Sequence, residues 1–171
     1  MDLQDFNALG VAEAATAVRP CVDIDRFVDA VVTGRPYADL ETLLATARAH
    51  AATWTPAEVS AALADHPRIG ERPAGDDASA ALSRSEQGGV TGLSDDELQA
   101  RIAAGNRAYE ERFDRIFLIR AAGRSATEIL HQLEQRLAND PDHELAVTAG
   151  ELAEIAVLRL RGLVTEGVGA R

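Results

Sequence analysis

Apolar residues recur three or four positions apart along most of this chain, the spacing that places side chains on one face of an α-helix. One such stretch spans residues 39–54, where the apolar face is formed by Leu40, Leu43, Leu44 and Ala47. Residues 23–32 also have a helical composition. We expect a helix in each stretch.

Helix starts are marked by capping sequences. Thr55 is followed by Pro56 and then Glu58, so a hydroxyl can cap the helix, proline suits its first turn and the carboxylate can reach back. Comparable signatures begin at Ser94, Ser125 and Asp140. They predict helices ending near residue 113, near residue 138 and near residue 164.

Two stretches interrupt the helical pattern. Residues 70–92 contain Pro73 and the glycines at 75, 88, 89 and 92, and are predicted to be a loop between two helical halves. Residues 116–119 have the length of a strand, but a lone strand has no partner for its backbone groups. We expect a buried turn or helix end there, and an all-α bundle of roughly seven to nine helices.

Composition supports one helical domain. The 171 residues are 46% hydrophobic but only 4% aromatic, so Leu, Ile, Val and Ala must build the core, as is usual in helix packing. A chain of this length fits a single domain over residues 1–171.

Charge and cysteine content restrict the partners. A net charge of −11 would repel nucleic acid and anionic membranes, and no stretch is long enough to span a bilayer. Cys21 is the only cysteine, so an internal disulfide is impossible, and the histidine spacings favour no zinc site. The acidic N-terminus lacks a secretion signal. We expect a cytoplasmic protein without a metal.

Three positions are polar where the pattern predicts burial. Arg159 lies on the apolar stripe of the last predicted helix, which is formed by Leu145, Leu152, Ile155 and Leu163. A buried guanidinium must meet an anion, supplied by the protein in a salt bridge or by a ligand. The sequence alone leaves both possibilities open.

His66 and the Glu86-Gln87 pair are the other two exceptions. Pro67 ends the helix that precedes His66, whose imidazole either caps helix carbonyls or transfers protons near neutral pH. The pair stands just before Gly88-Gly89 and is either a solvated turn or a polar site. Asn106, on another apolar stripe, is expected to satisfy a neighbouring backbone group.

Several short motifs in the same order resemble the 2-oxo-4-hydroxy-4-carboxy-5-ureidoimidazoline (OHCU) decarboxylase family. The motifs are Phe6-Asn7, Arg26-Phe27-Val28, Arg35-Pro36-Tyr37, His66-Pro67-Arg68-Ile69-Gly70, Ser83-Arg84-Ser85-Glu86-Gln87, Asn106-Arg107-Ala108-Tyr109, Arg112-Phe113, Arg136-Leu137-Ala138-Asn139-Asp140 and residues 151–160. This resemblance implies a homodimeric helical bundle that converts OHCU, supplied by hydroxyisourate hydrolase, to (S)-allantoin without a cofactor.

The resemblance also implies site residues. The catalytic residues would be His66 as proton donor, Glu86 acting on the ring hydroxyl or the imidazole, and Arg159 facing negative charge. Substrate contacts would come from Pro67, Ser83, Arg84, Ser85, Gln87, Phe117, Leu118, Ile119, Arg120 and Ala121, the last five partly through backbone groups.

One departure from the family pattern and one alternative function remain. Many members have Phe-Gly-Phe-Pro-Phe where this chain has Phe113-Asp114-Arg115-Ile116-Phe117, so the side-chain contacts of that region are not carried over from the family, and the effect of the departure on substrate binding stays open. The alternative is a non-catalytic helical binding module, with Arg159 in a salt bridge and the Glu86 loop contacting another protein.

Overall fold

The computed structural model describes residues 1–64, 66, 69 and 96–166. Its elements within these ranges are α1 (Leu3–Ala8), α2 (Val11–Val18), the 3₁₀ turn η1 (Arg19–Cys21), α3 (Asp25–Thr33), α4 (Leu40–Ala51), α5 (Pro56–Leu63), α7 (Asp96–Phe113), α8 (Ala126–Arg136) and α9 (Pro141–Leu163). The described residues contain no strand, only an isolated bridge between Asp2 and Thr165. The predicted all-α fold class is confirmed.

Contacts within the chain define two compact units, which we describe separately. The first comprises Met1–Glu58 and Ala153–Arg171, and the second comprises Val59–Leu152. Helix α9 therefore contributes its residues up to Leu152 to the second unit and the remainder to the first. The extent of one domain over residues 1–171 stays a prediction. In the described ranges, no helix has the length and apolar character needed to cross a membrane.

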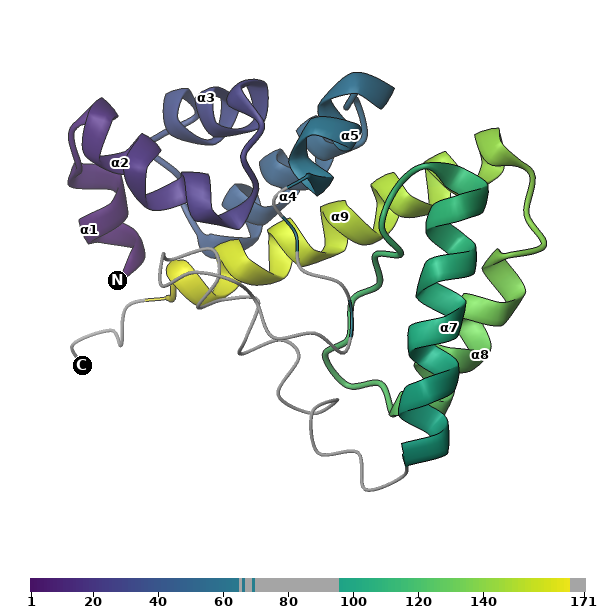
Figure 1. The fold of residues 1–171 in the computed structure, drawn as a ribbon. Coiled ribbons are helices and arrows are strands. Elements are labelled where there is room, and N and C mark those ends of the chain that lie inside the picture. Colours follow the sequence, from purple (N-terminus) through teal and green to yellow (C-terminus); the bar gives the residue numbers. More distant parts are fainter. Residues whose placement is uncertain (65, 67–68, 70–95, 167–171) are drawn as a thin grey trace. The chain divides into compact units, whose positions relative to one another are not determined.

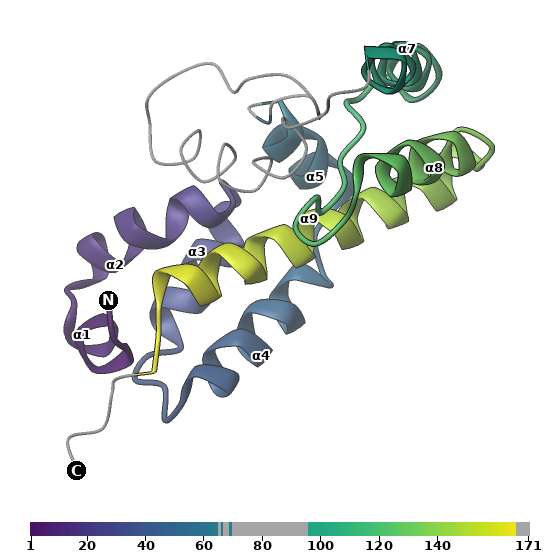
Figure 2. The same ribbon diagram turned by 90° about the horizontal axis from the view of Figure 1, so that it is seen from below.

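In the first unit, α2 packs against α3 and α3 against α4 (Figures 1 and 2). Each helix buries one apolar face, and the largest fully buried side chains include Phe6, Val18, Phe27, Leu43, Leu44 and Leu160. Residues near the N-terminus also pair with Thr165 in this unit. The N–H of Leu3 donates to the carbonyl of Thr165, and the N–H of Thr165 donates to the carbonyl of Met1, both at 3.0 Å.

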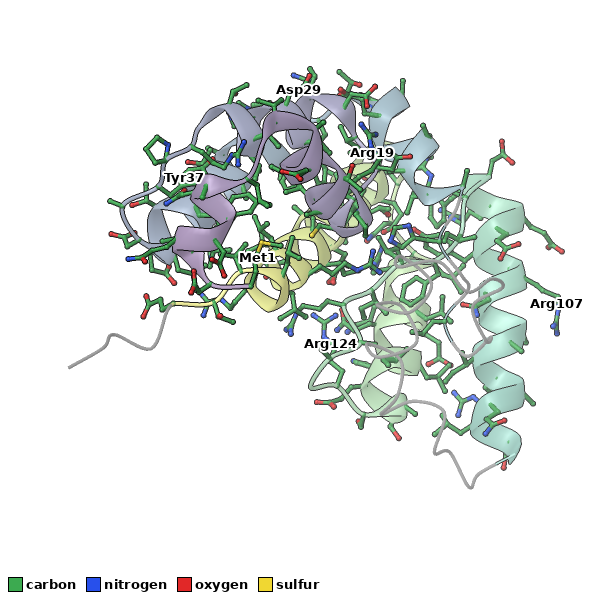
Figure 3. The ribbon with its side chains drawn as sticks, turned by 90° about the vertical axis from the view of Figure 1, so that its left-hand side faces the viewer. Met1, Arg19, Asp29, Tyr37, Arg107 and Arg124 are labelled. Carbon is green, nitrogen blue, oxygen red and sulfur yellow. The ribbon has the colours of Figure 1, made fainter. Side chains whose placement is uncertain are left out.

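Two of the motifs that carry the family resemblance hold the first unit together. Asn7 makes paired 2.9 Å hydrogen bonds with the backbone of Tyr37, which is labelled in Figure 3, and the Tyr37 hydroxyl donates to the carbonyl of Val31. Arg35 Nη1 donates to two carbonyls at the C-terminal end of α1, Phe6 and Leu9, at 2.8 Å each. These motifs are therefore explained by scaffold contacts.

Glu58 takes part in capping the N-terminus of α5. Its Oε2 accepts from the N–H and the hydroxyl of Thr55 at 2.8 Å, which is the predicted capping box. Both its oxygens also accept from Arg26 of α3 at 2.7 Å. Hydrogen bonds from Arg26, followed by those from Thr55, lower the pKa of Glu58 from its usual 4.5 to about 2.

We predict that Glu58 makes the stability of the protein depend on acid pH. Because its pKa is lower in the folded protein, its stabilising contribution is present above pH 4.5 and disappears as the pH falls toward 2. Glu58→Gln should flatten the fall in urea midpoint over this window. Glu41→Gln, which removes an exposed contact with Arg161, is the matched control and should leave the slope unchanged. A wild-type slope in Glu58→Gln would contradict this prediction.

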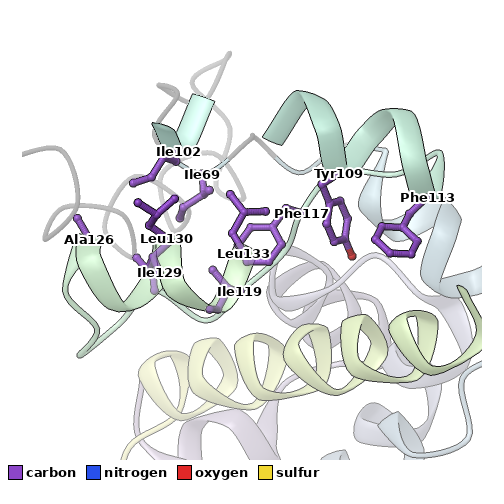
Figure 4. Packing of buried hydrophobic residues seen from close by; sticks show 11 residues of the cluster. Ile69, Ile102, Tyr109, Phe113, Phe117, Ile119, Ala126, Ile129, Leu130 and Leu133 are labelled. Atoms are coloured by element: carbon purple, nitrogen blue, oxygen red, sulfur yellow. The ribbon is translucent and has the colours of Figure 1, made fainter. Parts of the chain in front are cut away.

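In the second unit, α7 and α8 pack through the apolar cluster shown in Figure 4. Its side chains come from both helices, from the connection between them and from Ile69. Gly105 allows the close approach of the helices, since a Cβ there would lie only 2.6 Å from Leu133 Cδ2. Ile69, three positions after His66, therefore packs in the same cluster as Phe117 and Ile119.

The departure from the family pattern after α7 has a conformational explanation. Asp114 has a φ of 52°, in the left-handed region that favours glycine, and its N–H donates to the carbonyl of Glu110 to end the helix. Many family members have glycine at this position. Aspartate is among the few other residues that tolerate this conformation, so the helix end is kept.

Candidate active site

His66 lies just beyond α5 and is half-buried. Its Nδ1 is 2.9 Å from the carbonyl oxygen of Ala62. A carbonyl only accepts hydrogen bonds, so Nδ1 carries the hydrogen and the neutral ring has its lone pair on Nε2. The imidazole therefore caps a helix carbonyl, and of its two nitrogens Nε2 is the one that can exchange a proton without breaking this bond.

Arg159 lies in the part of α9 that belongs to the first unit. It is 3% exposed, so the prediction that it faces the core is confirmed. Its Nη1 donates to the carbonyl oxygens of Pro20 and Cys21 in η1, at 3.3 and 3.5 Å. Both acceptors are uncharged main-chain oxygens, and these two bonds help to orient the guanidinium.

Six residues of the predicted site lie outside the described residues: Pro67, Ser83, Arg84, Ser85, Glu86 and Gln87. The described part of the chain contains no group of three or more His, Cys, Asp or Glu side chains that could hold a metal ion.

The predicted substrate-contacting residues 117–121 form a non-helical connection between α7 and α8. Phe117, Leu118, Ile119 and Ala121 are buried, and Arg120 is half-buried. The expected burial of this region is correct, but the expected turn or helix end is wrong, because α7 ends at Phe113 and residues 116–121 belong to no helix or turn.

Charged side chains take the place of a neighbouring strand for this segment. Arg136 Nη1 donates to the carbonyl of Leu118 at 2.8 Å, and Glu151 Oε2 accepts from the backbone N–H of Arg120 at 2.7 Å. Backbone groups that would otherwise be unsatisfied are thereby paired without a sheet. Ile119 lies between these two residues, and neither its main-chain N–H nor its carbonyl makes a hydrogen bond to any residue that the structure describes.

A buried polar cluster supports the same segment from α7, α8 and α9. Arg136 donates to Glu144 Oε1 through Nε at 2.8 Å and Nη2 at 2.6 Å, and the Tyr109 hydroxyl donates to the same oxygen. Asn139 donates to Glu144 Oε2 at 2.7 Å. The guanidinium also lies over the ring of Phe117, 4.7 Å from its centroid.

The electrostatics of this cluster fix its protonation. Burial alone would raise the pKa of Glu144, but the hydrogen bonds from Arg136, Tyr109 and Asn139 outweigh it and lower the pKa. Burial, followed by the contact with the Glu144 carboxylate, raises the pKa of Tyr109 to about 12. At neutral pH the cluster therefore contains a carboxylate, a guanidinium and a neutral phenol.

Sequence reasoning did not identify this cluster. The stripe predicted for α9 is wrong in its first turns, where Glu144 and Thr148 are fully buried while Leu145 is half-buried. Glutamate in a first helical turn is usually a solvated residue near the positive end of the helix dipole. The available signal was Arg136, which follows Ile129 and Leu133 at helical spacing and therefore falls on the buried face of α8.

Asn106 has the structural role expected from its position. It is 5% exposed, and its Nδ2 donates to the carbonyl of Ile69 at 3.0 Å. This bond connects α7 to the motif that contains His66.

Comparison with known proteins identifies the family. The OHCU decarboxylase family model matches residues 7–161. The chain is 32% identical over 167 residues to the 2-oxo-4-hydroxy-4-carboxy-5-ureidoimidazoline decarboxylase of Amia calva, a match that covers 96% of this chain and 95% of that protein. The chain therefore belongs to the OHCU decarboxylase family. The predicted enzyme class, a carboxy-lyase, is confirmed.

A second relative is larger than this chain. The uric acid degradation bifunctional protein TTL of Arabidopsis thaliana is 35% identical over 107 residues, which make up 61% of this chain and 33% of that protein. The matched region thus spans about a third of the length of this relative.

Two solved structures resemble the fold. A crystal structure of OHCU decarboxylase in the presence of (S)-allantoin has a TM-score of 0.70 and 28% identity, covering 84% of this chain and 93% of that one. A crystal structure of (S)-allantoin synthase has a TM-score of 0.72 and 17% identity, covering 96% and 54%. The second similarity concerns the fold alone.

Proposed function

We propose that this protein decarboxylates OHCU in urate degradation and releases (S)-allantoin without a metal or organic cofactor. The observation that carries the proposal is the family match over residues 7–161, which spans every predicted site residue from His66 to Arg159. The 28% identical decarboxylase structure determined in the presence of (S)-allantoin supports the choice of product.

The substrate carries its own electron sink. When the bond between the ring carbon and the carboxylate breaks, carbon dioxide leaves and the electron pair moves toward the adjacent carbon–nitrogen double bond, whose nitrogen takes up a proton. The ring hydroxyl then loses its proton to become a carbonyl, and the ureido-bearing carbon gains one. The protein must orient the substrate and move these protons, so no cofactor is required.

His66 is proposed to deliver the proton that sets the configuration of the product. Because Nδ1 is engaged with the carbonyl of Ala62, the proton leaves from and returns to Nε2. Delivery from one fixed atom to one face of the ring would yield a single enantiomer. Glu86 is proposed to polarise the ring hydroxyl or hold the imidazole, with Gln87 and Ser83 binding the ureido and ring amide groups.

Arg159 is proposed to pair with negative charge on the substrate or intermediate. Its burial strengthens such an interaction because little water competes for the guanidinium. The planar fork also suits two parallel hydrogen bonds to a carboxylate or amide edge.

Residues 117–121 are proposed to contact the substrate through backbone groups. Ile119 is the best placed, because its N–H and carbonyl have no partner among the described residues. The other polar group of each of its two peptide units is held, the Leu118 carbonyl by Arg136 and the Arg120 N–H by Glu151. One donor and one acceptor on the same residue match a cyclic amide or urea edge, which also offers one of each.

The assembly and cellular context are part of the same proposal. The family resemblance supports a homodimer that receives OHCU from hydroxyisourate hydrolase, and the cytoplasm is proposed as its compartment. A net charge of −11 supports the expectation that neither nucleic acid nor an anionic membrane is a partner.

The direct test is the rate of OHCU disappearance in freshly prepared substrate. Purified protein should accelerate the decay well above the spontaneous rate, and dialysis against a chelator should leave this rate unchanged. A spontaneous rate in the presence of protein would contradict the activity. Loss of activity after chelation, restored by a divalent ion, would contradict the cofactor-free mechanism alone.

We predict that Arg159→Gln will lower kcat/KM by about 10²-fold to 10³-fold with little change in melting temperature, because the charge is needed by the substrate. Arg159→Lys should keep the stability but restore little activity, since lysine lacks the fork. Steady-state rates and thermal melts measure both effects.

The matched control for Arg159 is Arg161→Gln, two residues further along α9. Arg161 is exposed and contacts Glu41, so its loss should leave turnover unchanged. A large fall in melting temperature of Arg159→Gln with normal turnover per folded molecule would assign Arg159 to the scaffold.

A further inference from the structure

The carboxylate of Glu151 is hydrogen-bonded to the segment 117–121, which is proposed to contact the substrate. Its Oε2 accepts the backbone N–H of Arg120 at 2.7 Å, a short bond that is strengthened by the negative charge of the acceptor. Glu151 stands on α9, one residue before Leu152, which is fully buried. A rigid helix therefore fixes the main-chain position of a residue in an irregular connection.

Arg124 holds the carboxylate in place from the other side. Its Nη1 lies 3.3 Å from both oxygens of Glu151, and the two side chains are 28% and 18% exposed, respectively. Arg124 is at the turn before α8 (Figure 3), where its own N–H donates to the carbonyl of Ala121. Arg120, Glu151, Arg124 and Ala121 are thus connected in turn by a hydrogen bond, an ion pair and a main-chain hydrogen bond.

This arrangement engages three backbone groups of the segment on either side of Ile119 and beyond it. The N–H of Arg120 and the carbonyls of Leu118 and Ala121 are engaged within the protein, whereas the N–H and carbonyl of Ile119 bond to none of the described residues. The carbonyl of Ile119 and the N–H of Arg120 belong to one planar peptide unit, so the direction of one fixes the direction of the other. Loss of the hydrogen bond at the Arg120 N–H would therefore also release the Ile119 carbonyl.

We propose that Glu151 is a positioning residue, which fixes the Ile119–Arg120 peptide so that the Ile119 carbonyl faces the substrate. Glu151 acts through the backbone and does not touch the reacting atoms. The inference rests on the proposed function, since it concerns how the same site binds its substrate.

Its effect should fall mainly on KM. A contact made equally in the substrate complex and the transition state changes KM and leaves kcat largely unaltered. A hydrogen bond to a charged group contributes enough that Glu151→Ala should raise KM about 10-fold or more. Glu151→Gln keeps an oxygen that can accept from Arg120, so its KM should return to within about 3-fold of wild type.

The experiment compares steady-state kinetics of wild type, Glu151→Ala, Glu151→Gln and a control, Glu134→Ala. Glu134 is an exposed glutamate of α8 in the same unit, paired with Arg101, and its loss should change neither KM nor kcat. Melting curves establish the folded fraction of each variant, and hydrogen exchange of the peptide containing Arg120 reports the positioning itself.

The expected result is a raised KM and faster exchange of the Arg120 amide in Glu151→Ala, with both effects largely reversed in Glu151→Gln. If folded Glu151→Ala has the KM of wild type, and wild type is active, the positioning role is overturned and the proposed function stays intact. A fall confined to kcat would also overturn it. Failure of wild type to convert OHCU would instead overturn the proposed function, and this inference with it.

Discussion

Glu144→Gln should destabilise the protein by about 3 to 5 kcal/mol, as expected when one partner of a buried ion pair is removed. Glutamine has nearly the same shape and can still accept a hydrogen bond from Tyr109, but it leaves the Arg136 guanidinium, in a side chain only 5% exposed, without its counter-charge. Urea unfolding at neutral pH measures the change in free energy.

The control for this prediction is Glu134→Gln. Glu134 also pairs with an arginine at 2.6 Å, but both side chains are about half exposed, so its loss should cost less than about 1 kcal/mol. Equal effects of the two substitutions would show that burial of the Arg136–Glu144 pair is energetically unimportant. Because Arg136 also holds the carbonyl of Leu118, residual activity of folded Glu144→Gln should be reduced as well.

His66→Asn should keep the fold and lower kcat by about 10²-fold to 10⁴-fold, the usual contribution of a general acid or base. The asparagine amide can still donate to the carbonyl of Ala62, but it cannot exchange a proton near neutral pH. Single-turnover rates with saturating OHCU separate this loss from any change in binding.

The control here is His50→Asn, which replaces an exposed histidine in the last turn of α4. Its turnover should equal that of wild type. Near-normal turnover of His66→Asn would transfer the proton-donating role to another group, with Glu86 as the first candidate.

The helices were most predictable where capping residues mark their starts. Ser125 and Glu128 form the expected capping box of α8, and α9 begins at Pro141, directly after the predicted cap. The predicted ends of α7 and α9 differ from those observed by no more than one residue. Capping works as a signal because it depends on neighbouring residues alone and requires no tertiary contact.

The first two helices had no such prediction. α2 starts at Val11, and its N-cap residue Gly10 has no side chain to cap the helix, so the local sign is the Glu13 carboxylate that accepts from the Gly10 N–H. α1 has just six residues and is stabilised by tertiary contacts, including Arg35 at its C-terminal end. Short helices depend on packing, which a sequence pattern does not contain.

The candidate site was predictable only in part, for a related reason. The burial of Arg159 followed from helical periodicity, but the roles of His66 and Glu86 came from the family resemblance. The cluster around Glu144 and the Glu151 contact depend on which side chains meet in space, up to 35 residues apart in the sequence. Periodicity identifies a buried face but does not identify the partner that makes a charge on it tolerable.

Circular dichroism during turnover shows whether this protein converts OHCU to one enantiomer of allantoin. Wild type should produce the signal of (S)-allantoin faster than spontaneous decay produces racemic product, while His66→Asn at the same concentration should follow the uncatalysed course. Rapid loss of OHCU that yields racemic allantoin would contradict stereospecific proton delivery. A wild-type trace identical to that of buffer would contradict the function itself.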